Sequence, residues 1–173
     1  MCSRDMSTVE IVPIRPPASL ILCLLFAFSA QGALAEDLKA RVVSVLDGDI
    51  IEVLHNHRAE RIRLNGIDCP EKGQAYGKAA KHATSQLVFG KEVTLQTYGL
   101  DKYGRTLADV LLPDGTNVNH ALVKDGWCWW YRKYAPGDTV LEGLEKEARE
   151  AKKGLWIDPE PIPPWIFRIL RRD

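Results

Sequence analysis

The sequence predicts a β-rich α+β fold in which five short strands close into a barrel of the OB type, accompanied by three helices. Segments of alternating apolar and polar residues recur from residue 42 onward and are separated by turn dipeptides such as Asp-Gly. Segments with helical spacing of apolar residues occur once after the third strand and twice after the fifth. Five strands are too few for a sandwich, and closing them into a barrel removes their free edges.

The elements follow in order from these local patterns. The expected strands are residues 42–45, 50–54, 61–64, 91–97 and 106–112. The expected helices are residues 74–88, 118–124 and a longer one from Thr139 to Gly154, which opens with a Thr-x-x-Glu capping box. We expect one domain over residues 36–157. Four prolines after residue 157 predict an extended C-terminal tail, residues 158–173, that takes no part in a core.

Composition places the chain among ordinary globular proteins. It has 173 residues, of which 46% are hydrophobic and 27% charged. These values exclude a disordered chain, a collagen-like repeat and a disulfide-dense scaffold. The 23 basic and 23 acidic residues cancel, which argues against a protein that holds nucleic acid by a broad basic surface.

The first 35 residues have the pattern of a signal peptide. A polar segment with two arginines precedes an apolar run over residues 18–30, and the small-residue pair Ala33-x-Ala35 follows. We expect cleavage after Ala35 and a secreted or periplasmic protein that begins at Glu36. The apolar run is shorter than the roughly 20 residues that cross a bilayer, so we expect no stable membrane span after cleavage. The alternative is a membrane-anchored protein with an uncleaved leader.

Cleavage at that position would leave two cysteines, Cys69 and Cys128. In an oxidising compartment they could form one disulfide, but the sequence alone does not place their Cβ atoms. Two free, buried thiols are the other interpretation.

Charged residues suited to phosphate chemistry gather in three short segments. The first is Asp47-Gly48-Asp49, the second runs from Arg61 to Glu71, and the third is Asp101-Lys102-Tyr103-Gly104-Arg105. Their carboxylates are hard oxygen donors that suit Ca²⁺ or Mg²⁺, and their arginines match phosphate oxygens. This set indicates metal-assisted phosphodiester hydrolysis. Surface ion pairs on a barrel are the alternative that spacing alone leaves open.

The same segments resemble, in order, the motifs of the staphylococcal nuclease-like (thermonuclease) family. The resemblance covers roughly residues 38–157, and the motifs are Val45-Leu46-Asp47-Gly48-Asp49, Arg63-Leu64-x-x-Ile67-Asp68-Cys69-Pro70-Glu71 and Asp101-Lys102-Tyr103-Gly104-Arg105. The family fold is an OB barrel with three helices. The chain departs from the family at Ile50, where a threonine is common, and in the segment 71–76, which is shorter than the prototype's loop.

The resemblance implies a role for each charged residue of the motifs. Asp49 and Asp68 would be ligands of Ca²⁺, with the backbone carbonyl of Cys69 as a third. Glu71 would activate or position the attacking water. The implied catalytic arginines, which hold the scissile phosphate, are Arg63 and Arg105. The implied product is a 3′-phosphate end on DNA or RNA.

Aromatic and basic residues near the motifs complete the expected site. The resemblance implies substrate contacts by Lys102, Tyr103, Tyr131 and Tyr134, and we expect a monomer that prefers single-stranded or denatured nucleic acid. For the neighbouring tryptophans of residues 127–130, packing against the barrel is the simpler interpretation. The alternative function is a non-catalytic OB-type module that binds single-stranded nucleic acid or a protein partner.

Overall fold

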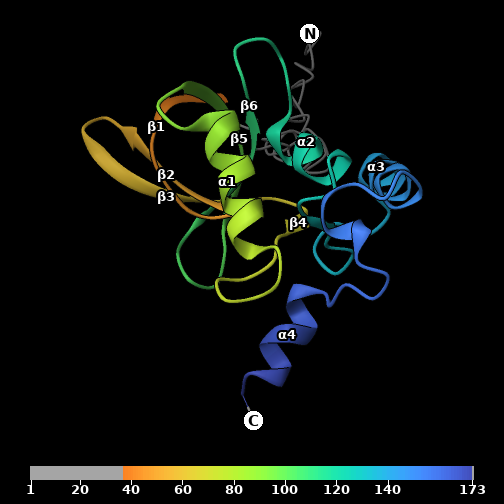
Figure 1. Cartoon of the computed structure of the whole chain (residues 1–173). Helices are drawn as coiled ribbons and strands as arrows, with labels where there is room; N and C mark the ends of the chain where they lie inside the picture. Colours follow the sequence, from red (N-terminus) through yellow and green to blue (C-terminus); the bar gives the residue numbers. More distant parts are fainter. Residues whose placement is uncertain (1–36, 173) are drawn as a thin grey trace, which may run out of the picture. The chain divides into compact units, whose positions relative to one another are not determined.

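The computed structural model describes residues 37–172, in which five strands close a barrel (Figure 1). The barrel strands are β1 (Asp37–Asp47), β2 (Ile50–His55), β3 (Arg58–Leu64), β5 (Glu92–Leu100) and β6 (Thr106–Leu111). They are hydrogen-bonded in the order β1-β2-β3-β6-β5, and β5 closes the barrel by pairing with β1. Only the β3–β6 pair among these is parallel. The expected five-stranded OB-type barrel is confirmed.

The remaining elements cover the barrel and extend it. The helices are α1 (Gly77–Val88), α2 (Val118–Lys124), α3 (Thr139–Glu150), the 3₁₀ helix η2 (Gly154–Ile157) and α4 (Pro164–Leu170). A separate two-stranded sheet joins β4 (Ile67–Asp68) to β7 (Trp129–Trp130). Within residues 37–172 no helix has the length and apolar character that crossing a membrane requires. The leader lies outside the described residues.

The core fills the barrel with alternate residues of each strand. Ile51 and Val53 of β2, with Ile62 and Leu64 of β3, point inward and are almost fully buried. Strand β1 pairs with both β2 and β5, and its register against β2 shifts twice. Such bulges bend a strand and increase its twist, which a small closed barrel requires. The tryptophans of β7, Trp129 and Trp130, are also buried, as the packing interpretation predicts.

Helix α3 starts as expected at Thr139, but its cap differs from the prediction. The N-cap is Asp138, whose carboxylate accepts hydrogen bonds from the backbone N–H groups of Val140 and Leu141. A carboxylate at this position satisfies two free N–H groups and interacts favourably with the helix dipole. The capping box that begins at Thr139 is therefore wrong by one residue.

The prediction of an extended tail is also wrong for its last part. Residues 164–170 form α4, whose first residue is Pro164. Proline suits the first position of a helix, because its fixed φ is helical and the N–H it lacks would have no partner there. The number of prolines predicted an extended chain, but the last of them, Pro164, is the first residue of a helix.

A buried asparagine of α2 ties the end of β3 to β6. Asn119 is 1% exposed, and its amide nitrogen donates to the carbonyls of Asn65 and Ala108 and to the Asp109 carboxylate. Its Oδ1 accepts a hydrogen bond from the N–H of Val110. These bonds fix the turn that carries the chain from the barrel toward β4.

Replacing this side chain should leave several buried polar groups without partners. We expect Asn119→Ala to lower the free energy of unfolding by about 2–4 kcal/mol, measured by urea denaturation. As a control, Asn117→Ala removes the cap hydrogen bond to the N–H of His120 and should cost about 1 kcal/mol. Equal losses in the two variants would contradict the role assigned to Asn119.

Candidate functional site

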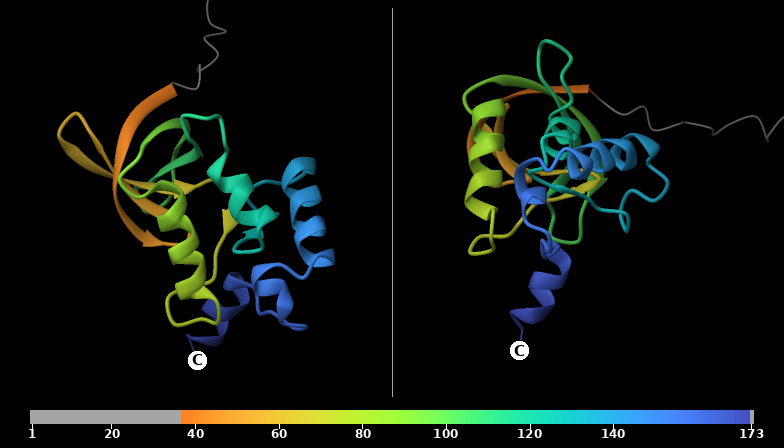
Figure 2. Two further views of the ribbon diagram at one scale, coloured as in Figure 1. Left: turned by 45° about the horizontal axis from the view of Figure 1, so that its top comes forward. Right: turned by 45° about the vertical axis from the view of Figure 1, so that its right-hand side comes forward.

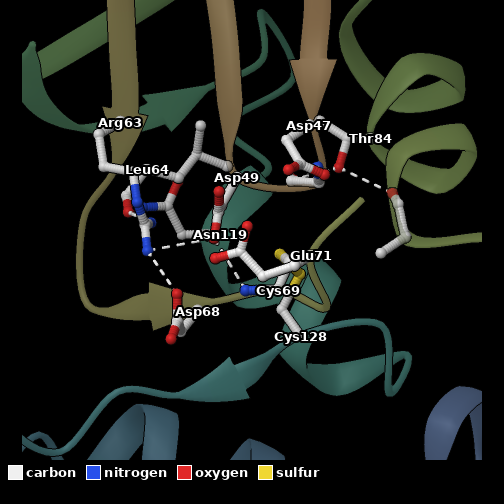
Figure 3. Close-up of a disulfide and its surroundings, with 12 residues drawn as sticks. Asp47, Asp49, Arg63, Leu64, Asp68, Cys69, Glu71, Thr84, Asn119 and Cys128 are labelled. Carbon is white, nitrogen blue, oxygen red and sulfur yellow. Dashed lines mark hydrogen bonds and ion pairs between the residues drawn. A yellow bond between two sulfur atoms is a disulfide. The ribbon is translucent and has the colours of Figure 1, made fainter. Parts of the chain in front are cut away.

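The Asp-Gly-Asp turn between β1 and β2 is held from two sides (Figure 3). On one side, the Thr84 hydroxyl of α1 donates to the carbonyl of Gly48 at 2.5 Å. On the other, a Cβ added to Gly48 would lie 2.7 Å from the Cβ of Cys69. No larger residue fits without moving the chain, so glycine allows the turn to approach Cys69 and places Asp47 and Asp49 beside it.

Arg63 joins the two aspartates that the sequence predicts as metal ligands. Its Nη2 lies 2.9 Å from Asp68 Oδ1 and 3.1 Å from Asp49 Oδ2 (Figure 3). Arg63 is on β3, and the turn at Gly66, with φ of 72°, redirects the chain so that Asp68 faces back toward it. Asp49 and Asp68 are 6% and 2% exposed, so the three charges interact with little screening by water.

Cys69 is fixed by a hydrogen bond and by a covalent bond. Its backbone N–H donates to Asp49 Oδ2 at 2.8 Å. Its sulfur forms a disulfide with Cys128, immediately before β7 (Figure 3). The structure thus decides between the disulfide and the free thiols that the sequence left open. The bridge and the β4–β7 pairing together hold the backbone on which Asp68 and Cys69 lie.

Glu71 lies on the short segment that precedes α1. Its N–H donates to the side-chain oxygen of Gln74 at 2.9 Å, and the Gln74 amide nitrogen donates to the carbonyl of Ile162 at 2.6 Å. This segment is short and hydrogen-bonded at both ends. In the left view of Figure 2, α4 lies beside this segment, and its residue Arg168 contacts Glu71.

A second arginine, which the sequence analysis missed, reaches the same carboxylates from α4. Arg168 Nη2 lies 2.7 Å from Asp68 Oδ2, and its Nη1 lies 2.5 Å from Glu71 Oε1. The same Nη1 is 3.3 Å from Asp68 Oδ1. Asp68 is therefore held on one side by Arg63 and on the other by Arg168.

The cluster carries more negative than positive charge. Burial, together with the nearby carboxylates of Asp49 and Glu71, raises the pKa of Asp47 to about 6. Burial also raises the pKa of Asp68, although hydrogen bonds from Arg168 act in the opposite direction. When all four carboxylates are ionised, their charge exceeds that of the guanidinium groups of Arg63 and Arg168 by two, and Asp47 is also near a lysine, Lys81. This is the electrostatic condition that favours a divalent cation.

The expected ligands of such a cation include one backbone carbonyl besides carboxylate side chains. Within residues 37–172, no three side chains of His, Cys, Asp or Glu converge as a ready metal site. The expected set needs only two carboxylates, Asp49 and Asp68, because its third member is the carbonyl of Cys69. All three are hard oxygen donors, the type that Ca²⁺ prefers.

The third motif adjoins β3, because Thr106, directly after Arg105, pairs with Ile62, directly before Arg63. Asp101 holds Arg105 in the turn between β5 and β6, with Arg105 Nη2 at 2.6 Å from its carboxylate. Arg105 and Tyr103 line a groove of about 820 Å³, together with Arg61 of β3. Lys102 lies over the ring of Tyr103, with its Nζ 4.9 Å from the ring centre. No contact in the described residues joins Arg105 directly to Asp49, Asp68 or Glu71.

The two remaining tyrosines of the prediction lie together after β7. The rings of Tyr131 and Tyr134 meet edge to face, with their centres 4.9 Å apart. A second ring, that of Trp165 in α4, is stacked on Tyr131 with 5.2 Å between centres and an angle of 3°. Tyr131 is also close to the cluster, since the charges of Asp68 and Arg168 act on its hydroxyl.

Comparison with known proteins assigns this arrangement to a family. Residues 61–158 match the family described as staphylococcal nuclease homologue. The chain belongs to the staphylococcal nuclease family. Among its relatives, an uncharacterised endonuclease of Escherichia coli O157:H7 is 49% identical over 145 residues, which cover 84% of this chain and 94% of that protein. A micrococcal nuclease of Shigella flexneri is 43% identical over 141 residues, or 76% of this chain and 81% of the relative.

This staphylococcal nuclease homologue is therefore a hydrolase that cleaves phosphodiester bonds. Of the five charged residues that the family resemblance assigned to the site, all but Arg105 lie in one cluster. The prediction missed Asp47 as a member of the charged cluster, although it quoted the residue within the turn motif. It also missed Arg168 and Trp165, for which the tail gave one signal, an aromatic and a basic residue three positions apart after Pro164.

In this staphylococcal nuclease homologue the disulfide should contribute strongly to stability. It links residues 59 positions apart, and the chain-entropy relation gives about 4 kcal/mol for a loop of this length. We expect the double variant Cys69→Ala/Cys128→Ala to unfold at clearly lower urea concentration. Wild-type protein kept in reducing agent should match it, and a variant as stable as the oxidised wild type would contradict this expectation.

Proposed function

We propose that the protein is an exported, Ca²⁺-dependent endonuclease that cleaves DNA, RNA or both and leaves 3′-phosphate ends. The observation that carries the proposal is the cluster of buried Asp49 and Asp68 around Arg63, with Glu71 close by and with an excess of negative charge. A surface ion pair needs neither the burial nor the clustering of like charges. Both make sense where a cation and a phosphate are to be bound.

Asp49, Asp68 and the carbonyl of Cys69 are the groups that would hold the ion. When bound, Ca²⁺ polarises the phosphoryl group and offsets the charge that develops in the transition state. The hydrogen bond from the Cys69 N–H to Asp49 Oδ2 fixes two of these three groups relative to one another. Such preorganisation lowers the cost of collecting ligands around the ion.

Glu71 supplies the base in this proposal. It accepts a proton from water as the water oxygen forms a bond to phosphorus, and the bond from phosphorus to the 5′ oxygen breaks. The departing 5′ oxygen takes up a proton, so the products are a 3′-phosphate and a 5′-hydroxyl. Arg63 donates hydrogen bonds to phosphate oxygens during this step, and Arg105 is assigned the same task. The side chain of Glu71 is 32% exposed, so water can reach it.

The groups proposed to bind substrate suit an unpaired strand. Tyr103, Tyr131 and Tyr134 offer aromatic rings, and stacking requires bases that are not enclosed in a duplex. Positive charge beside them is local, at Lys102 and Arg105, which agrees with a chain of zero net charge. We therefore propose a preference for single-stranded or denatured nucleic acid. We also propose that the active form is a monomer.

Export is supported by the leader pattern and by the disulfide. Disulfides persist in secreted and periplasmic proteins and are rare in reducing compartments. The Cys69–Cys128 bridge lies beside the proposed metal ligands, so the site depends on an oxidising environment. Mass measurement of the N-terminus of the exported protein tests cleavage after Ala35. A full-length, membrane-bound product would instead favour the anchored alternative.

The function itself is tested with a labelled single-stranded oligonucleotide. We expect cleavage in millimolar Ca²⁺, complete loss of cleavage when a Ca²⁺ chelator is in excess, and recovery when Ca²⁺ is restored. Treatment of the products with a phosphatase that removes 3′-phosphates should change their mobility. Stable binding of the oligonucleotide without cleavage in Ca²⁺ would support the alternative binding module.

Removing the proposed base should abolish most activity without loss of the fold. We expect Glu71→Gln to lower kcat by about 10²–10⁴-fold, since general-base catalysis contributes an effect of that size. Glu147→Gln on the exposed side of α3 is the control for loss of one carboxylate and should retain wild-type kcat. A Glu71→Gln enzyme within a few-fold of wild type would exclude Glu71 as the base.

A further inference from the structure

Helix α4 places the guanidinium of Arg168 against Asp68, a proposed Ca²⁺ ligand, and Glu71, the proposed base. Arg168 contacts both carboxylate oxygens of Asp68, at 2.7 and 3.3 Å, and one oxygen of Glu71 at 2.5 Å. Together with Arg63, which takes Asp68 Oδ1 and Asp49 Oδ2, it leaves neither oxygen of Asp68 free of a guanidinium. A hydrogen bond donated to Glu71 also opposes the acceptance of a proton from water.

The same helix places an aromatic ring where a nucleobase is expected. Trp165 is stacked on Tyr131, with nearly parallel rings, and its edge contacts Trp129 at 5.6 Å between centres. A base stacked on this face of Tyr131 would have to displace the indole ring. Two neighbouring side chains of α4 therefore occupy the places of two different ligands of the proposed reaction. Arg168 takes the place of the metal cation, and Trp165 takes the place of the nucleobase.

Only a few contacts attach α4 to the rest of the molecule. The attachment rests on Arg168, Trp165, buried Pro164 and the hydrogen bond from Gln74 to the carbonyl of Ile162. The other face of the helix is open, with Ile166, Ile169 and Leu170 exposed. Arg168 itself has a side chain that is 36% exposed. A seven-residue helix held in this way can undock without disturbing the barrel.

We propose that α4 is an autoinhibitory cover that competes with Ca²⁺ at Asp68, with proton acceptance at Glu71 and with a nucleobase at Tyr131. This inference rests on the proposed function and adds regulation to the same site. Because only molecules with an undocked helix bind Ca²⁺, the apparent Kd equals the intrinsic Kd divided by the fraction of molecules in which the helix is undocked. If the helix is closed nine-tenths of the time, the apparent Kd is about ten times the intrinsic Kd. Ca²⁺ and substrate bind the open form and thereby shift the population toward it.

Direct measurement of Ca²⁺ binding tests the cover without relying on catalysis. Isothermal titration of the purified protein with Ca²⁺ alone should give a Kd for Arg168→Ala that is at least five-fold lower than for wild type. Arg168→Lys keeps the charge but loses the forked contact with Asp68, so its Kd should lie between the two. Arg172→Ala removes the same charge from the exposed end of the chain and should match wild type.

Hydrogen exchange gives a second measurement on the unaltered protein. Amides of residues 166–170 should exchange faster when Ca²⁺ and a single-stranded oligonucleotide are both present, whereas those of the barrel should not. Unchanged protection of these amides under saturating Ca²⁺ and oligonucleotide would overturn the proposal. An equal or weaker Ca²⁺ affinity in Arg168→Ala would also overturn it.

The outcomes separate this proposal from two other results. If wild-type protein binds Ca²⁺ and cleaves, but Arg168→Ala raises KM for the oligonucleotide without tighter Ca²⁺ binding, Arg168 is a substrate ligand and the cover is excluded. The proposed nuclease function stands in that case. If neither wild type nor Arg168→Ala binds Ca²⁺ and wild type does not cleave in its presence, the proposed function fails and the cover fails with it.

Discussion

The close approach of four carboxylates is the constraint on which the rest of this structure depends. Asp47 and Asp49 come from the turn between β1 and β2. Asp68 and Glu71 come from the segment after β3, which lies outside the barrel. Burial penalises the charged forms and like charges repel one another, and both effects raise the pKa of Asp47. Holding these groups together therefore requires both opposite charge and a rigid frame.

The frame is built from contacts that act on the backbone rather than on the carboxylates. Thr84 fixes the first turn, and the disulfide fixes the second segment at Cys69. Asn119 holds the turn between them through buried hydrogen bonds. Each contact links elements far apart in sequence, so the position of the site depends on completion of the barrel and of its neighbouring helices. The small residue at Gly48 is what allows the two segments to approach.

The local parts of this architecture could be predicted from sequence, because each strand and each motif is a short pattern. Alternation over residues 61–64 predicted the strand on which Arg63 lies. Short sequence patterns could not predict contacts between residues that lie far apart in the sequence. Arg168 and Asp68 are 100 residues apart, and no spacing rule brings them together. The proline-rich stretch before α4 pointed instead toward an extended chain, since its helix-starting role depends on the residues that pack beneath it.

Arg168 changes the interpretation of the neutral net charge. Averaged over the chain, acidic and basic residues cancel, yet the cluster is locally acidic and draws its compensation from α4, at the other end of the sequence. That compensation is intramolecular, because the guanidinium of Arg168 contacts carboxylate oxygens of both Asp68 and Glu71. In the proposed mechanism, the contact of Arg168 with Asp68 and Glu71 gives way to a divalent cation and a phosphate before hydrolysis. Under that proposal, docking of α4 and readiness for catalysis are opposed at one side chain, and the limited attachment of α4 determines how easily one gives way to the other.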